Sequence, residues 1–269
     1  GVIESSTPYS YSYGKTSYAI LNVTGNMTIK NSTITSGSNG SIGIENRSGN
    51  KITLEGNTVT ASGAMITNAG EIKITSGTYT GTTFTNSGKV VINGGEISTN
   101  GSASTWSSLF VTSGEAEING GTLKCTGRTD GAQPAAVANS GTLKITGGTF
   151  SSGSIGVYNS NEALITGGSI TGNYAGISNI KELTLGVQGD IDEDGKLVVS
   201  KESPMIKGTT IGFLNSTDGT FKFYDGVIKG KTDSINNPEG SEVKVPDGYE
   251  IELIEKLLDV VWGYEKGEL

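Results

Sequence analysis

Apolar and polar side chains alternate in short runs that recur along most of the chain. In the segment NSGTLKITGGTF, Leu143 and Ile145 alternate with polar residues after Asn139. A Gly pair follows, then the apolar Phe150, and a third apolar patch leads back to the next Asn. Because a period of two is typical of strands that bury one face, each unit predicts three short strands separated by turns.

The unit returns after roughly 20 residues or more, with insertions of irregular length. An Asn stands two places after an apolar residue in eight units, and Thr112 takes its place in one. The asparagines are Asn22, Asn46, Asn68, Asn86, Asn139, Asn159, Asn179 and Asn215. A fixed minimum length with variable insertions indicates a solenoid, in which each unit buries its apolar face against its neighbours.

We therefore predict an all-β chain, folded as a right-handed parallel β-helix of about nine coils with three strands per coil and a cap at each end. The handedness follows from the usual hand of parallel crossover connections. Residues 1–17 are the predicted N-terminal cap, 18–235 the β-helix, and 236–269 a C-terminal cap or linker. Apolar residues at helical spacing in 249–264 favour some helix in this tail, whereas YEIEL alone would also form a strand.

The corner residues predict how one coil stacks on the next. Gly pairs permit left-handed backbone angles, and Asn tolerates them too. Stacked Asn side chains are expected to hydrogen-bond along the column. The positions after the Gly corner are expected to point inward: Ile34, Val59, Tyr79, Ile97, Leu123, Phe150 and Ile170.

Charge and composition exclude several classes of function. The net charge is −8 and no basic stripe is present, which argues against nucleic acid and anionic membranes as partners. No apolar run approaches the ~20 residues that span a bilayer. Histidine is absent and Cys125 is the only cysteine, so His-dependent triads and internal disulfides are excluded.

The repeats ITGGTF, INGGTL and ITGGSI, with the closing stretches GTFKFYDGVIKGKTDSI (219–235) and VPDGYEIE (245–252), resemble pectate-lyase-like right-handed β-helices. More narrowly, they are similar to β-helical segments of large secreted or wall-linked proteins of Gram-positive gut bacteria. This resemblance implies an extracellular or cell-surface location and a place among other domains of a longer chain. It leaves function open, because proteins with this fold include enzymes of many kinds and proteins without catalytic activity.

Enzymes of that superfamily carry their acids and bases on the outward face of one sheet. Here the outward positions of the strand after each Asn mix Lys, Glu and Thr, and Lys144 neighbours Glu117. Such neighbours predict cross-strand ion pairs. Glu162 and Glu182 stack as like charges, and are either a candidate catalytic pair or two solvated side chains.

Two further segments carry candidate binding residues. The loop GDIDEDG places Asp190, Asp192 and Asp194 as in the opening of a calcium loop, but Lys201 stands where the bidentate Glu belongs. The loop is thus a Ca²⁺ site or an acidic surface loop, and no other cofactor is implied. The adjacent insertions 98–108 and 124–134 are expected to project from one edge and to offer a sugar-binding surface. Their candidate ligand-binding residues are Trp106, Arg128, Asp130 and Gln133.

Three functions remain open at this point. The first is a non-catalytic surface module, an adhesin-like stalk or glycan-binding segment whose partner is a polysaccharide or host glycan. The second is a polysaccharide lyase or glycoside hydrolase acting on an acidic glycan. The third is a structural spacer stabilised by calcium.

Overall fold

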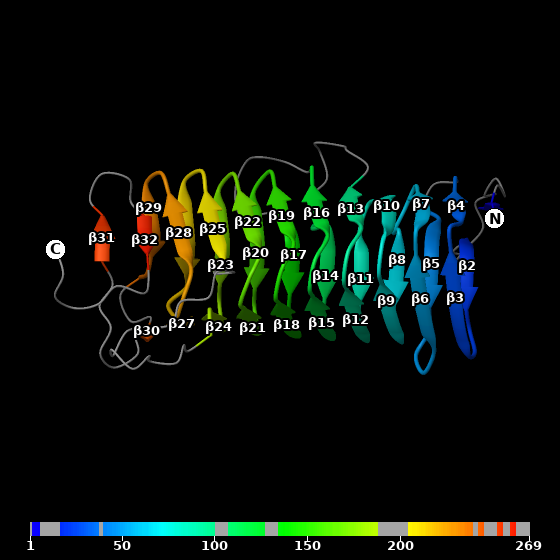
Figure 1. The fold of residues 1–269 in the computed structure, drawn as a ribbon, viewed down its shortest axis with the longest axis horizontal. Coiled ribbons are helices and arrows are strands. Elements are labelled where there is room, and N and C mark those ends of the chain that lie inside the picture. Colours follow the sequence, from blue (N-terminus) through cyan, green and yellow to red (C-terminus); the bar gives the residue numbers. More distant parts are fainter. Residues whose placement is uncertain are drawn as a thin grey trace, which may run out of the picture.

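The protein is described here by a computed structural model covering residues 17–37, 40–99, 107–126, 134–187 and 204–238. The backbones of four further strands, 2–5, 242–244, 252–254 and 259–261, are also described. This part of the chain is all β, and its strands form three sheets that run the length of one column (Figure 1). The chain is a right-handed parallel β-solenoid, as the alternating pattern predicts.

Each coil contributes one strand to each sheet. Sheet A contains, in spatial order, β1 (Val2–Ser5), β4 (Thr33–Ser36), β7 (Asn57–Ala61), β10 (Gly77–Gly81), β13 (Glu96–Thr99), β16 (Thr122–Cys125), β19 (Thr149–Ser152), β22 (Ser169–Gly172), β25 (Met205–Gly208), β28 (Val227–Gly230), β32 (Asp259–Val261) and β31 (Glu252–Ile254). Sheet B contains β2 (Tyr18–Asn22), β5 (Ile42–Asn46), β8 (Ile66–Asn68), β11 (Phe84–Asn86), β14 (Phe110–Thr112), β17 (Ala135–Asn139), β20 (Ile155–Asn159), β23 (Ala175–Asn179), β26 (Ile211–Asn215) and β29 (Asp233–Asn236). Sheet C contains β3 (Asn26–Lys30), β6 (Lys51–Glu55), β9 (Glu71–Ile74), β12 (Lys89–Ile92), β15 (Glu115–Ile118), β18 (Thr142–Ile145), β21 (Glu162–Ile165), β24 (Glu182–Leu185), β27 (Thr220–Phe223) and β30 (Glu242–Lys244).

The strand order confirms the predicted coil number. Successive triplets from β2–β3–β4 (coil 1) to β26–β27–β28 (coil 9) make nine complete coils, which are numbered in this way below. Equivalent residues of neighbouring coils pair in register, such as Ile44 with Ile66 and Ile66 with Phe84. The irregular insertions leave this register intact.

The interior is one continuous apolar column. Buried and more exposed residues alternate along the strands of sheets A and C, as in β13 and β18, so a single coil has no core of its own and acquires one by stacking. Phe84 and Phe110 pack edge to face with ring centroids 4.9 Å apart, and Phe213 stacks on Phe221 at 3.9 Å. All of the positions predicted to point inward after the Gly corner are buried: Ile34, Val59, Tyr79, Ile97, Leu123, Phe150 and Ile170.

The two glycines of each Gly pair serve different purposes. The second has a left-handed φ, for example 101° at Gly95 and 90° at Gly121, as predicted. The first lies close to the preceding coil: a Cβ on Gly120 would stand 2.7 Å from the carbonyl oxygen of Asn93. The asparagines of the repeat do not use a left-handed φ, since Asn31 is the only non-glycine residue in the described ranges that does.

The expectation of helix in the C-terminal tail is wrong for its described residues. Glu252–Ile254 and Asp259–Val261 are strands, and β32 pairs antiparallel with both β28 and β31. An unpaired strand edge at the end of a sheet favours strand addition over a helix. The described residues of the tail therefore continue sheet A instead.

Candidate functional site

A column of asparagine side chains lines the buried corner between sheets B and C. The amide of each Asn donates to the side-chain oxygen of the next coil, at 2.9 Å from Asn22 to Asn46 and 2.7 Å from Asn68 to Asn86. The same NH₂ groups reach backbone carbonyls, as from Asn68 to Lys89 at 3.0 Å. The predicted hydrogen-bonded column is thus confirmed, and its polar atoms serve the fold.

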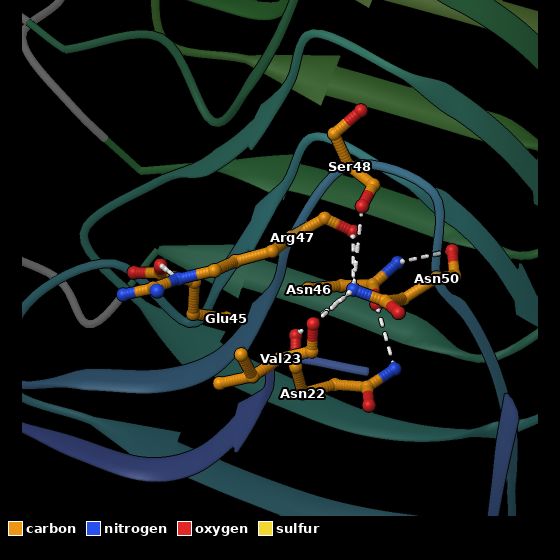
Figure 2. A network of polar contacts seen from close by, with 7 residues as sticks. All are labelled: Asn22, Val23, Glu45, Asn46, Arg47, Ser48 and Asn50. Atoms are coloured by element: carbon orange, nitrogen blue, oxygen red, sulfur yellow. Dashed lines mark hydrogen bonds and ion pairs between the residues drawn. The ribbon is translucent and has the colours of Figure 1, made fainter. Parts of the chain in front are cut away.

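Figure 2 shows the polar network where the first two coils meet at this corner. The buried Asn50 side chain accepts the N–H of Gly25 at 2.8 Å and donates to the carbonyls of Val23 and Arg47 at 3.0 and 3.1 Å. The Arg47 side chain extends away from Asn50 and pairs with Glu45 at 3.2 Å. Asn50 therefore fastens coil 2 to coil 1.

An open groove of about 970 Å³ follows the outside of the same corner from coil 1 to coil 7. Its floor consists of small residues at the turn, such as Ser87 with Gly88 and Ser140 with Gly141. One wall carries alternating charges: Lys51, Glu71, Lys89 and Glu115. A smaller depression of about 210 Å³ adjoins it and is lined by Lys89, Val90, Glu115, Ala116, Glu117, Thr142 and Lys144.

Several polar groups that line this groove already bond within the protein. Ser87 Oγ donates to the carbonyl of Asn68 at 3.3 Å, and Ser140 Oγ to that of Thr112 at 3.3 Å. A Cβ on Gly114 would collide with the carbonyl oxygen of Gly88, so close coil stacking alone requires glycine there. The groove is therefore a consequence of the tight corner, and its floor offers a ligand few free donors.

The wall charges form ion pairs between neighbouring coils. Lys51 pairs with Glu71 at 2.7 Å and Lys89 with Glu115 at 3.3 Å. Another pair, Lys144 with Glu117 at 3.0 Å, confirms the expected pairing of these two residues. All of these groups are substantially exposed, so each pair contributes on the order of 0–1 kcal/mol to stability.

Glu162 and Glu182, the candidate catalytic pair, are brought together in register on sheet C. Both side chains are exposed, and neither has an ion-pair partner among the described residues. Thr142 precedes them in the same column and Thr220 follows them. Two adjacent carboxylates are the minimum for glycoside hydrolysis, but here they lie on an open strand surface.

The outward face of sheet A is a feature that the sequence reasoning missed. From coil 1 to coil 7 this face is almost free of charge and consists of threonine and serine, beginning with Thr33 and Thr35 on β4. The signal was present in the sequence as segments such as TIT, TVT, TYT and SIT. The Lys, Glu and Thr columns that the sequence predicts lie on the strands that follow each Asn, which form sheet C.

The other candidate residues lie outside the described residues. These are Trp106, Arg128, Asp130 and Gln133 in the insertions, and Asp190, Asp192 and Asp194 in the acidic loop. The flanking strands do fix where the insertions depart, because β13 and β16 pair in parallel and both insertions follow them. The two insertions therefore leave from the same end of sheet A.

The comparisons with known proteins assign no family. No protein-family model, no curated protein and no solved structure matches this chain. In the described part of the chain no helix is long and apolar enough to cross a membrane. The class that the fold defines is the right-handed parallel β-solenoid, and a more specific assignment has to rest on surface chemistry.

Proposed function

We propose that this chain is a non-catalytic module of an extracellular or cell-surface protein, an adhesin-like stalk that presents a glycan-binding surface. In this proposal it is flanked by other domains of a longer chain, and its partner is a polysaccharide or host glycan. The resemblance of its repeats to pectate-lyase-like β-helices of Gram-positive surface proteins supports the location.

The observation that carries the proposal is that most glutamates on the outward face of sheet C form ion pairs with lysines. Acid–base catalysis on a solenoid needs carboxylates that converge on one substrate position and have separated pKa values. Here Glu71, Glu115 and Glu117 each pair with a lysine of a neighbouring coil. Such a surface favours solubility and binding over catalysis.

The alternative is hydrolysis or elimination of an acidic glycan by Glu162 and Glu182. It is favoured by one observation, the register that stacks these two carboxylates on adjacent coils. It predicts release of new chain ends, which the double variant Glu162→Gln/Glu182→Gln would abolish.

A glycan-array screen with an assay for new reducing ends and unsaturated products tests both functions. Wild type, Trp106→Ala/Arg128→Ala and Glu162→Gln/Glu182→Gln would be compared at matched concentration. We expect binding without cleavage, and loss of part of that binding in the Trp106→Ala/Arg128→Ala variant. Cleavage that disappears in the glutamine variant would show that the enzymatic alternative is correct. Absence of any glycan binding would indicate that the module is a structural spacer.

A further inference from the structure

The outward face of sheet A carries two straight columns of side chains across seven coils. In-register pairing aligns position 33 with 58, 78, 96, 122, 149 and 169, and position 35 with 60, 80, 98, 124, 151 and 171. Twelve of these 14 positions carry a hydroxyl group: Thr33, Thr35, Thr58, Thr60, Thr78, Thr80, Ser98, Thr122, Thr149, Ser151, Ser169 and Thr171. The exceptions are Glu96 and Lys124, and the pattern ends with Met205 and Lys207 in coil 8.

Strand propensity does not explain this composition. Threonine is favoured on strand surfaces in general, so a purely structural origin would enrich sheet C equally. The equivalent 14 outward positions of sheet C in coils 1–7 include eight charged residues: Lys51, Glu71, Lys73, Lys89, Glu115, Glu117, Lys144 and Glu162. The two faces share strand geometry and coil spacing, yet one is charged and the other is neutral and hydroxyl-bearing.

The hydroxyl array is rigid, regular and free to bond outward. β-Branched threonine has few χ1 states, and parallel strands repeat about every 4.8 Å across the sheet and about 6.6 Å between alternate residues. Among the twelve hydroxyls in the described chain, only Thr80 and Ser98 form a hydrogen bond, to each other at 3.5 Å. The remaining hydroxyls form no hydrogen bond within the described chain, and all twelve side chains are exposed or half-buried, so they offer donors and acceptors in a two-dimensional repeat.

We propose that this face of sheet A, coils 1–7, binds a neutral polysaccharide presented as a solid, repeating surface. The inference rests on the proposed function and names the partner and the position of the site. A face with almost no charge matches an uncharged partner, and hydroxyls that both donate and accept match the hydroxyls of sugars. A flat surface cannot enclose one soluble sugar, whereas many weak contacts in a matching array add up through avidity.

The two charged interruptions supply a gain-of-function variant. Glu96 and Lys124 lie on adjacent coils, in different columns, and separate the six threonines of coils 1–3 from the hydroxyls of coils 6 and 7. Both side chains are exposed, so threonine fits at either position without disturbing the core. The variant Glu96→Thr/Lys124→Thr completes the array and is expected to bind several-fold more tightly.

Retention on insoluble cellulose and chitin, measured by depletion of protein from solution, tests the site. Thr58→Lys/Thr60→Lys places two cations in coil 2, where the outward positions of both neighbouring coils are all threonine. This variant is expected to weaken retention by about ten-fold or more. The matched control Thr142→Lys/Thr184→Lys adds the same charge on sheet C, where Thr142 also lines the groove, and is expected to stay within about two-fold of wild type. Thermal melts of each variant establish that it is folded.

Each outcome decides between the inference and the proposed function. Equal loss in both lysine variants, or loss in the control alone, would move the site away from sheet A. A wild type that binds glycans on the array but neither cellulose nor chitin overturns the inference and leaves the proposed function standing. Adsorption only to ice or only to acidic polygalacturonate also overturns the inference, and the partner in the proposed function would then change. A wild type that binds no glycan in any form overturns both.

Discussion

The side-chain amide of Asn86 donates to Thr112 Oγ1 at 3.0 Å, and this is the only described step of the ladder in which the acceptor is not an amide oxygen. Beyond it, no hydrogen bond in the described chain joins Thr112 to Asn139, its in-register neighbour on the next coil. The ladder is therefore divided into an N-terminal run ending at Thr112 and a C-terminal run beginning at Asn139.

Replacing Thr112 with asparagine should stabilise the protein. Thr112→Asn adds an amide that reaches both neighbours, as Asn139 reaches Asn159 at 2.7 Å. We expect the free energy of unfolding to rise by about 1 kcal/mol, measured by urea or thermal denaturation. Thr112→Val, which keeps the shape and removes the hydroxyl, serves as the control and should destabilise. A Thr112→Asn variant less stable than wild type would mean that the corner in coil 5 cannot hold the larger side chain.

Removing an amide from the middle of a run should be strongly destabilising. Asn159 accepts from Asn139 and donates to Asn179 at 2.8 Å and to the carbonyl of Glu182 at 2.9 Å. Asn159→Ala removes the donor to the buried Asn179 Oδ1 and one acceptor of the Asn139 amide, so a loss of about 3 kcal/mol is expected in chemical denaturation. Asn161→Ala, two residues away and exposed, removes one hydrogen bond to Gly141 and should cost less than about 1 kcal/mol. Similar losses for both variants would contradict a special role for the ladder.

The stacked corner glycines should not tolerate a methyl group. A Cβ on Gly114 would overlap the carbonyl oxygen of Gly88, which is backbone and cannot move without displacing the coil. Gly114→Ala is therefore expected to lower stability by about 2 kcal/mol or more. Gly37→Ala is the control, because a Cβ there meets nothing within 4 Å. Equal melting temperatures for the two variants would show that the coils can separate locally at this corner.

Tyr79 should make stability fall at alkaline pH. Burial raises the pKa of this phenol to about 12, against a smaller opposing effect of its hydrogen bond with Asn57. The folded state then holds the proton between pH 10 and pH 12 while the unfolded state loses it, so stability declines as pH rises through this window, by about 2–3 kcal/mol in total.

The variant Tyr79→Phe isolates this effect. It loses the hydrogen bond to the carbonyl of Ser76, 2.9 Å long, and should be about 1 kcal/mol less stable at pH 7. Its stability should be flatter than that of wild type from pH 10 to pH 12, as followed by urea denaturation at each pH. Tyr158→Phe, at a half-buried outward position, is the control for the loss of a tyrosine outside the core.

Calcium dependence remains a prediction from the acidic loop. If Asp190, Asp192 and Asp194 hold Ca²⁺, EDTA should lower the melting temperature and excess Ca²⁺ should restore it. Asp192→Asn/Asp194→Asn should remove that response while leaving the melting temperature in EDTA unchanged. A melting temperature indifferent to EDTA would identify the segment as an acidic surface loop.

The sequence by itself determined the architecture. Alternation at Leu143 and Ile145, the Asn that precedes them and the Gly pair that follows are local signals, and each acts through backbone geometry that one coil defines. Repetition then fixes the rest, because a coil that cannot bury its own apolar face must stack on its neighbour. The repeat also predicts that Thr112 takes the place of an asparagine in the ladder and that Lys144 pairs with Glu117.

Tertiary structure decided which outward residues share a surface. The hydroxyl face depends on register across insertions of different length, so Ser98 and Thr122 become close neighbours of Thr80 and Thr149 only in the folded column. Tertiary contacts also determined the structure at the C-terminal end of the solenoid. The apolar spacing of the tail suits a helix, but the open edge of β28 offers backbone hydrogen bonds that only a strand can satisfy. Local pattern specifies the coil, whereas contacts between distant coils specify its faces and its end.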